Sequence, residues 1–351
     1  MSKLRFIIIS LSTVLWLAKC TSPPVTDQYK LAEIFADYVG NDVPGAAVLV
    51  IQDGQKELKG TFGIANLDAR EPVGSNTNFR LASVTKQFTA MCILMLVDRD
   101  SLRLDDRLGG IFPDFPPFAD RITIMHLLQH TSGLLDYEDF VPSDSPEQVS
   151  DSDVLDILIA TDSTYFEPGV EFRYSNSGYA VLALIVEKYS GQTFAEFLKQ
   201  NIFDPLGMQN TVAFQNGIST VPNRAFGYTV TDEVVENTDQ SPTSAVLGDG
   251  GIYSSLDDLY RWDQALYTDT LVSADLLAKA FTPNLENYGF GWRVDEYKGR
   301  RRCHHSGGTS GFRNFIQRFP DERMTIIVLT NRAEPDVQPL AERVADIVIG
   351  H

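Results

Sequence analysis

A serine and a lysine one helical turn apart are the first residues here whose types and spacing could do chemistry. Ser83 and Lys86 lie in the stretch Phe79–Phe88, where apolar residues at helical spacing predict a helix that begins near Ser83. Three residues at about 100° each bring both side chains to one face. The amine could take the hydroxyl proton, while backbone N–H groups at the helix start stabilise an oxyanion. The alternative interpretation is a capping serine followed by an exposed lysine.

A tyrosine and an asparagine two residues apart form the second candidate pair. Tyr174 and Asn176 follow a Pro168-Gly169 turn and precede a predicted helix that Asn176 or Ser177 could cap. Residues two apart in an extended segment point to the same side, so both side chains can enter one cleft. A phenol becomes a usable base when a neighbouring ammonium stabilises its anion. The alternative is a packed tyrosine beside a capping asparagine.

A histidine and two glycines at the end of a predicted strand form the third candidate. Gly307 and Gly308 follow His305, and a substrate backbone could closely approach a strand edge without side chains. The Gly308 N–H could then be the second oxyanion donor, beside the Ser83 N–H. His305 could hold or relay a proton at neutral pH. A glycine-rich hairpin turn with an exposed histidine is the alternative interpretation.

These three motifs each occur once, in this order, and together they resemble the serine β-lactamase and penicillin-binding-protein superfamily. The resemblance covers residues 43–332 and is closest to the class C β-lactamases, the D-alanyl-D-alanine carboxypeptidases and the related esterases and D-aminopeptidases. Three further stretches resemble family landmarks, in addition to Phe79–Arg80 before the nucleophile: Leu127–Leu134, Phe166–Gly169 and Tyr288–Trp292. Within the first of them, the resemblance implies a structural role for His130 rather than that of a triad base.

The resemblance implies roles for the paired motifs. Ser83 is the acylated nucleophile, Lys86 and Tyr174 shuttle the proton, and Asn176 holds the substrate amide. Ser83 and Gly308 supply the oxyanion N–H groups. Which of Lys86 and Tyr174 is the general base stays open.

The substrate is less defined than the reaction. His305 stands where β-lactamases usually carry the lysine of a Lys-Thr-Gly triplet, which argues against efficient β-lactam hydrolysis and resembles the carboxypeptidase and D-aminopeptidase branch. In that branch a nearby arginine can bind a substrate carboxylate, and Arg293 is the candidate; a surface arginine is the alternative. We expect a serine acyl-hydrolase that acts on D-alanyl peptides, including peptidoglycan peptides, or on β-lactam-type substrates. An ester hydrolase of the same fold and a non-catalytic penicillin-binding sensor are the alternatives.

The elements that must position these residues indicate an α/β (α+β) fold. Strand patterns near both ends of the chain and helical patterns between them predict a mainly antiparallel sheet flanked by helices, with an inserted helical subdomain. The late strands are expected at Tyr288–Val294, Arg301–Ser306, Phe312–Phe319 and Met324–Thr330, followed by a final helix at Val337–Ile349. We divide the chain into a signal peptide (1–19), a sheet domain (20–78 and 245–351) and a helical subdomain (79–244), with the cleft between the last two. No ligand spacing argues for zinc, and no cofactor is implied.

Composition and the first residues bear on partners and location. The 351 residues carry a formal charge of −18, which argues against nucleic-acid binding. Lys3 and Arg5 precede a short apolar run that ends near Leu17, which is typical of a targeting segment. The sequence up to Cys20 resembles a lipoprotein signal, although Lys19 replaces the expected small residue. We therefore expect export to the periplasm or envelope of a bacterium, membrane attachment through lipid on Cys20, and a monomer.

Overall fold

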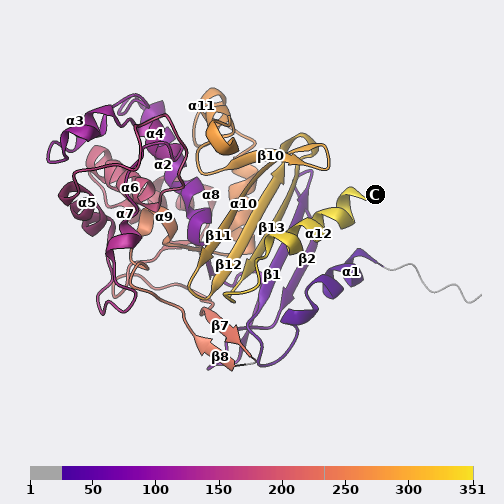
Figure 1. The fold of residues 1–351 in the computed structure, drawn as a ribbon. Helices are drawn as coiled ribbons and strands as arrows, with labels where there is room; N and C mark the ends of the chain where they lie inside the picture. The colour runs from indigo at the N-terminus through magenta and orange to yellow at the C-terminus, as the bar shows by residue number, and fades with distance from the viewer. Residues whose placement is uncertain (1–25, 233, 351) are drawn as a thin grey trace, which may run out of the picture.

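The computed structural model describes residues 26–232 and 234–350, and its main feature is a six-stranded antiparallel sheet (Figure 1). The strand order is β10-β11-β12-β13-β1-β2, so the end of the chain pairs with its beginning. The strands are β1 (Ala46–Gln52), β2 (Gln55–Phe62), β10 (Arg293–Tyr297), β11 (Arg300–Thr309), β12 (Phe312–Phe319) and β13 (Met324–Thr330).

The central strands of this sheet are buried on both faces, whereas the edge strand β2 is largely exposed. The central pair, β1 and β13, runs in register from Ala46 opposite Thr330 to Gln52 opposite Met324, and nearly every residue in it is buried. One face packs against α1 (Asp27–Ile34) and α12 (Gln338–Ile349), which cross it in Figure 1. The other face packs against α10 (Leu256–Ala265) and the helical part of the molecule. Continuous apolar strands are what a sheet covered on both sides requires.

The helical part lies beside one edge of the sheet and is organised around α2 (Lys86–Asp98) and α6 (Asn176–Ser190) (Figure 1). Every residue of α2 from Lys86 to Leu96 is buried. The other helices are α3 (Leu108–Ile111), α4 (Ile124–Leu128), α5 (Asp151–Ala160), α7 (Phe194–Leu198), α8 (Asp204–Leu206), α9 (Leu247–Gly250) and α11 (Ala274–Ala280). The remaining strands of the described residues are short. One small sheet consists of β5 (Phe79–Arg80), β9 (Ile252–Ser254) and β6 (Val212–Ala213). Two ribbons consist of β3 (Ile64–Asn66) with β4 (Glu71–Pro72), and of β7 (Tyr228–Thr231) with β8 (Val234–Asn237).

The predicted fold class is confirmed, and the last two strands and the final helix lie where the sequence placed them. The predicted strand Tyr288–Val294 is wrong, because β10 begins only at Arg293. Gly291 has φ +74°, and a Cβ there would lie 2.7 Å from the Lys86 carbonyl oxygen. The segment before β10 is therefore a loop pressed against the start of α2. The division of the chain into domains at 79 and 245 stays a prediction.

The predicted signal peptide (1–19) and the lipidation site at Cys20 lie outside the described residues. Within residues 26–232 and 234–350, no helix has both the length and the apolar character needed to span a bilayer.

Candidate active site

Ser83 lies in a tight turn between β5 and α2. Ala82 before it has φ +49°, a left-handed backbone that costs about 1–3 kcal/mol in a non-glycine residue and occurs most often at functional sites. Residues Ala82–Thr85 form one turn of 3₁₀-helix, so the α-helix begins at Lys86 rather than near Ser83. A Cβ on Gly307 would lie 2.1 Å from the Leu81 carbonyl oxygen, so only glycine lets β11 approach this turn so closely.

Lys86 is fully buried and directs its ammonium at the nucleophile. Its Nζ donates to Ser83 Oγ at 3.2 Å, to Asn176 Oδ1 at 2.8 Å and to the backbone oxygen of Asp249 at 2.9 Å. The three acceptors come from the nucleophile turn, from α6 and from α9. The position of Lys86 is therefore fixed by segments that are distant in the sequence.

Tyr174 lies against this lysine. The Lys86 Nζ is 5.0 Å from the centre of the Tyr174 ring. The Tyr174 Oη is buried and has no hydrogen-bond partner within the described part of the chain. Ser175, rather than the predicted Asn176 or Ser177, caps α6, because its Oγ accepts from the Gly178 N–H at 3.1 Å. With the cap supplied by Ser175, the Asn176 side chain is free to accept from Lys86.

His305 is buried on β11, and both of its ring nitrogens are engaged. Its Nε2 lies 2.9 Å from Tyr288 Oη and its Nδ1 2.6 Å from the Ser306 carbonyl oxygen. Burial, followed by the charge of Lys86, lowers the pKa of His305 to about 3. The ring is therefore neutral near pH 7, and the predicted proton-carrying role does not fit this environment. A neutral ring with its proton on Nδ1 instead accepts from Tyr288.

Gly308 lies where β11 has a free edge. β10 pairs with β11 only as far as His304, so the edge from His305 to Thr309 has no partner strand in the structure as described. A small pocket of about 40 Å³ opens here. Its walls are formed by Arg80, Ala82, Ser83, Tyr137, Glu138, Asn176, Thr243, Asp249, Gly250, Gly308 and Thr309. Ser83, Asn176 and Gly308 thus share one pocket, whereas Gly307 packs beneath it.

Two carboxylates line the pocket, and the motifs did not single out either of them. Glu138 Oε1 accepts from Asn176 Nδ2 at 3.2 Å. The buried carboxylate of Asp249 accepts from Tyr137 Oη at 3.0 Å. Burial raises the pKa of both acids, while the charge of Lys86 opposes the rise. The sequence offered only indirect signals, an acidic run after Asp136 and an aspartate between two glycines.

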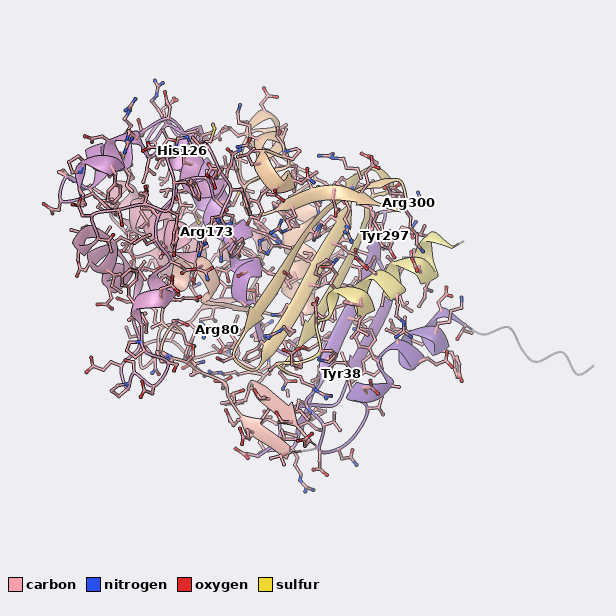
Figure 2. All side chains as sticks on the ribbon, viewed as in Figure 1. Tyr38, Arg80, His126, Arg173, Tyr297 and Arg300 are labelled. Carbon is pink, nitrogen blue, oxygen red and sulfur yellow. The ribbon has the colours of Figure 1, made fainter. Side chains whose placement is uncertain are left out.

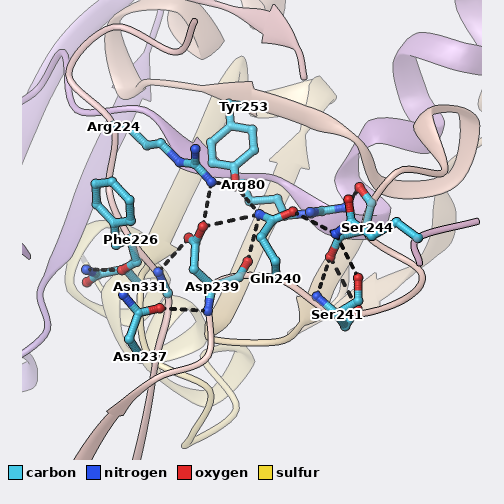
Figure 3. Close-up of polar contacts among 12 residues, drawn as sticks. Arg80, Arg224, Phe226, Asn237, Asp239, Gln240, Ser241, Ser244, Tyr253 and Asn331 are labelled. Atoms are coloured by element: carbon cyan, nitrogen blue, oxygen red, sulfur yellow. Dashed lines mark hydrogen bonds and ion pairs between the residues drawn. The ribbon is translucent and has the colours of Figure 1, made fainter. Parts of the chain in front are cut away.

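Two arginines lie near the site, and the one predicted to bind a substrate carboxylate is not the one that lines the pocket. Arg293 lies over the rings of Phe172 and Tyr288 and is not among the described residues that line the Ser83 pocket. Arg80 does line it. Figure 3 shows the Arg80 side chain extending to Ser244, whose carbonyl oxygen accepts from its Nη2 at 2.8 Å. Arg80 therefore adds a buried positive charge to the site, whereas the sequence had indicated this residue only as part of the family landmark Phe79–Arg80.

The basic hairpin tip between β10 and β11, residues 298–302, lies at the opposite end of the sheet from the Ser83 pocket. Figure 2 shows Tyr297 and Arg300 beside α12, far along the sheet from Arg80. Arg300 pairs with Glu322, and the buried Arg302 pairs with both Asp295 and Glu342. These arginines therefore form ion pairs that stabilise the fold.

The described ranges contain no cluster of three or more His, Cys, Asp or Glu side chains that could hold a metal ion.

Comparisons with known proteins agree with this geometry. A family model described as Beta-lactamase matches residues 31–349. Penicillin-binding protein 4* of Bacillus subtilis (strain 168) is 36% identical over 308 residues, which make up 82% of this chain and 68% of that protein. A D-aminopeptidase of Gluconobacter oxydans (strain 621H) is 28% identical over 300 residues, or 82% of this chain and 56% of that protein. This chain thus spans just over half of the aminopeptidase. The octameric penicillin-binding protein homologue from Pyrococcus abyssi has a TM-score of 0.78 and 27% identity, over 92% of this chain and 75% of that one.

Proposed function

Because the chain belongs to the β-lactamase family, we propose that it cleaves acyl bonds in two steps through a covalent intermediate on Ser83. The family resemblance predicted from the sequence is confirmed, and the protein is a serine hydrolase of the β-lactamase fold. The contact of 3.2 Å between the buried Lys86 Nζ and Ser83 Oγ is the observation that carries the proposal, because Ser83 itself lines the pocket at the β11 edge.

In the first step Ser83 Oγ attacks the substrate carbonyl, and its proton passes to neutral Lys86 or to the Tyr174 phenolate. The oxyanion that forms is stabilised by the N–H groups of Ser83 and Gly308. The carbonyl then re-forms, and the leaving group departs with the transferred proton. In the second step water gives a proton to the same base and attacks the acyl-Ser83 ester, which releases the acid and regenerates the serine. Both candidate bases remain in this scheme.

The charges of the pocket favour one substrate class. Glu138 and Asp249 place two carboxylates near Ser83, and opposite charges attract strongly where water is partly excluded. The Arg80 guanidinium in the same walls acts on Asp249, which leaves Glu138 as the carboxylate for a free ammonium group beside the scissile carbonyl. Together with the likeness to a D-aminopeptidase, this supports short peptides or amides that begin with a D-amino acid. The carboxypeptidase alternative predicted an arginine for the substrate carboxylate, and Arg293 lies over the rings of Phe172 and Tyr288 rather than among the described residues that line the pocket.

The test compares D-alanine p-nitroanilide with its N-acetyl derivative, and adds p-nitrophenyl butyrate, nitrocefin and a peptide that ends in D-Ala-D-Ala. We expect the free amine to be hydrolysed at least tenfold faster than the acetylated compound, with an acyl adduct in the intact mass. Ser83→Ala should abolish turnover, the adduct and labelling by a fluorescent penicillin, while the circular dichroism spectrum stays unchanged. Normal hydrolysis by Ser83→Ala would refute the mechanism. Faster cleavage of the acetylated compound would refute the substrate class.

The chain's first residues support a further proposal about where it acts. A basic start, an apolar run and Cys20 are typical of an exported lipoprotein, so we propose that the protein resides in the bacterial envelope and meets D-alanyl peptides there. We also propose, separately from this signal, that it acts as a monomer. Mass spectrometry of the membrane fraction should find a lipid on Cys20. Cys20→Ser should release the protein from that fraction.

A further inference from the structure

His130 is completely buried beside the site and has no part in the proton transfers described above. Its backbone has φ +57°, a left-handed conformation that histidine and asparagine adopt more readily than most residues. The residue makes two hydrogen bonds to a single short segment. Its carbonyl oxygen accepts from the Arg173 N–H at 3.0 Å, and its Nδ1 accepts from the Ser175 N–H at 3.1 Å. One histidine therefore holds the backbone on both sides of Tyr174.

The ring of His130 also contacts the Tyr174 side chain. The two ring centres are 4.3 Å apart with the planes tilted by 36°. On its other sides the imidazole packs against Tyr179 at 5.1 Å and Tyr288 at 4.4 Å. Since the Lys86 ammonium lies 5.0 Å from the centre of the same Tyr174 ring, a shift of the imidazole would move the phenol relative to the lysine.

We propose that His130 is a positioning residue that fixes the Tyr174 phenol relative to Lys86 and Ser83. The inference rests on the proposed function only in assigning Tyr174 to proton transfer. Catalytic groups must hold their geometry closely, and a displacement of about 1 Å can cost about a hundredfold in rate. No hydrogen bond of the Tyr174 hydroxyl supplies this restraint, because its Oη has no partner within the described ranges. The restraint comes from the backbone on either side and from the ring face.

The chemistry of this contact selects the test variants. Nδ1 can accept from Ser175 only when the imidazole is neutral and carries its proton on Nε2. Burial, followed by the charge of Lys86, holds the pKa of His130 well below its ordinary value, so the ring stays an acceptor at neutral pH. An asparagine places an amide oxygen close to the position of Nδ1 and tolerates the left-handed backbone. A glutamine places its amide near Nε2, where it cannot replace the bond to Ser175.

The experiment measures kcat and KM for wild-type protein, His130→Asn, His130→Gln, Tyr174→Phe and the two double variants. We expect His130→Gln to lower kcat by about 10–100-fold with KM within about twofold. His130→Asn should stay within about fivefold of wild type. In the Tyr174→Phe background, His130→Gln should cost less than about twofold, because the phenol it positions is already gone.

The matched control is His126→Gln. His126 also accepts a backbone N–H through Nδ1, from Thr123 at 3.3 Å, but it lies in α4 and is not among the described residues that line the Ser83 pocket. Its kcat should equal that of wild type, and melting temperatures identify any variant that fails to fold.

Crystal structures of His130→Asn and His130→Gln give a readout that does not depend on activity. The Tyr174 ring should stay in place in the first and move in the second. Equal kcat losses in the two variants, full additivity with Tyr174→Phe, or an unmoved ring in His130→Gln would each overturn the proposal. If wild-type protein proved inactive, the proposed function would fail, and the ring positions alone would still decide this inference.

Discussion

Replacing Lys86 with methionine separates the catalytic role of its amine, as a proton acceptor, from the structural role of its hydrogen bonds. Methionine nearly matches the length of the side chain but removes the donor to Ser83 Oγ, Asn176 Oδ1 and the Asp249 carbonyl. Each charge-assisted bond is worth about 1.5–3 kcal/mol. Burying an ammonium itself costs several kcal/mol, and methionine escapes that cost. Because these effects oppose each other, we expect the free energy of unfolding to change by no more than about 2 kcal/mol.

The catalytic effect should be larger than the structural one. Loss of a positioned proton acceptor costs about 10²–10⁴ in rate, which corresponds to about 3–5 kcal/mol of transition-state stabilisation. The assay is single-turnover hydrolysis of D-alanine p-nitroanilide, read together with urea unfolding. Lys188→Met is the control, because Lys188 also donates to a backbone oxygen and lies over an aromatic ring, but in α6 away from Ser83. Hydrolysis by Lys86→Met within threefold of wild type would remove Lys86 from the mechanism.

Three further outcomes follow from the same geometry. Glu138→Gln should raise KM for the free amine severalfold and leave KM for p-nitrophenyl butyrate unchanged; equal changes for both would dissociate Glu138 from ammonium binding. Burial lowers the pKa of His304 to about 4 and that of His305 to about 3. Below pH 6.5 these histidines therefore bind protons in the unfolded chain while they stay neutral in the folded chain. The free energy of unfolding should fall as the pH is lowered from 6.5 toward 3. Urea unfolding at several pH values should show a shallower fall for His305→Gln, and an unchanged slope would contradict the argument. Tyr174→Phe removes a buried hydroxyl that has no hydrogen-bond partner among residues 26–232 and 234–350, and it should stabilise the fold by about 1 kcal/mol while slowing hydrolysis; a lower melting temperature would show that the hydroxyl is satisfied.

The sequence predicted the elements of this fold well where one physical signal dominates. β12 and β13 are apolar runs between clear turn residues, and their bounds were predicted residue for residue. The segment from Tyr288 to Trp292 reads as a strand by composition, but Gly291 must press its backbone on Lys86. That contact is a tertiary constraint, and no local pattern reports it.

The motifs predicted Ser83, Lys86 and Asn176 because the spacing of these residue types is what the proposed chemistry requires. The structure brings Ser83 and Asn176 within hydrogen-bond reach of the Lys86 ammonium, although the individual roles of the three residues stay predictions. The pocket walls could not be predicted in the same way. Glu138 lies in an acidic run that resembles an ordinary solvated surface, and Asp249 reaches the site only because α9 packs on α2 and α6. Substrate specificity depends on which loops meet at the pocket, and no local pattern in the sequence predicts those long-range contacts.

The packing around Lys86 explains why its neighbours are polar although they are buried. An ammonium without water needs acceptors, and those that it has come from the nucleophile turn, α6 and α9. The remaining walls are the rings of Tyr174 and Tyr179, with their centres at 5.0 and 5.5 Å from Nζ, whose electron-rich faces also favour a cation. A hydrophobic core would be more stable at this position, so the polar cluster is retained at a cost in stability. Its members are held by contacts outside the cluster, such as those of His130, and substitutions there should reach the chemistry without touching the substrate.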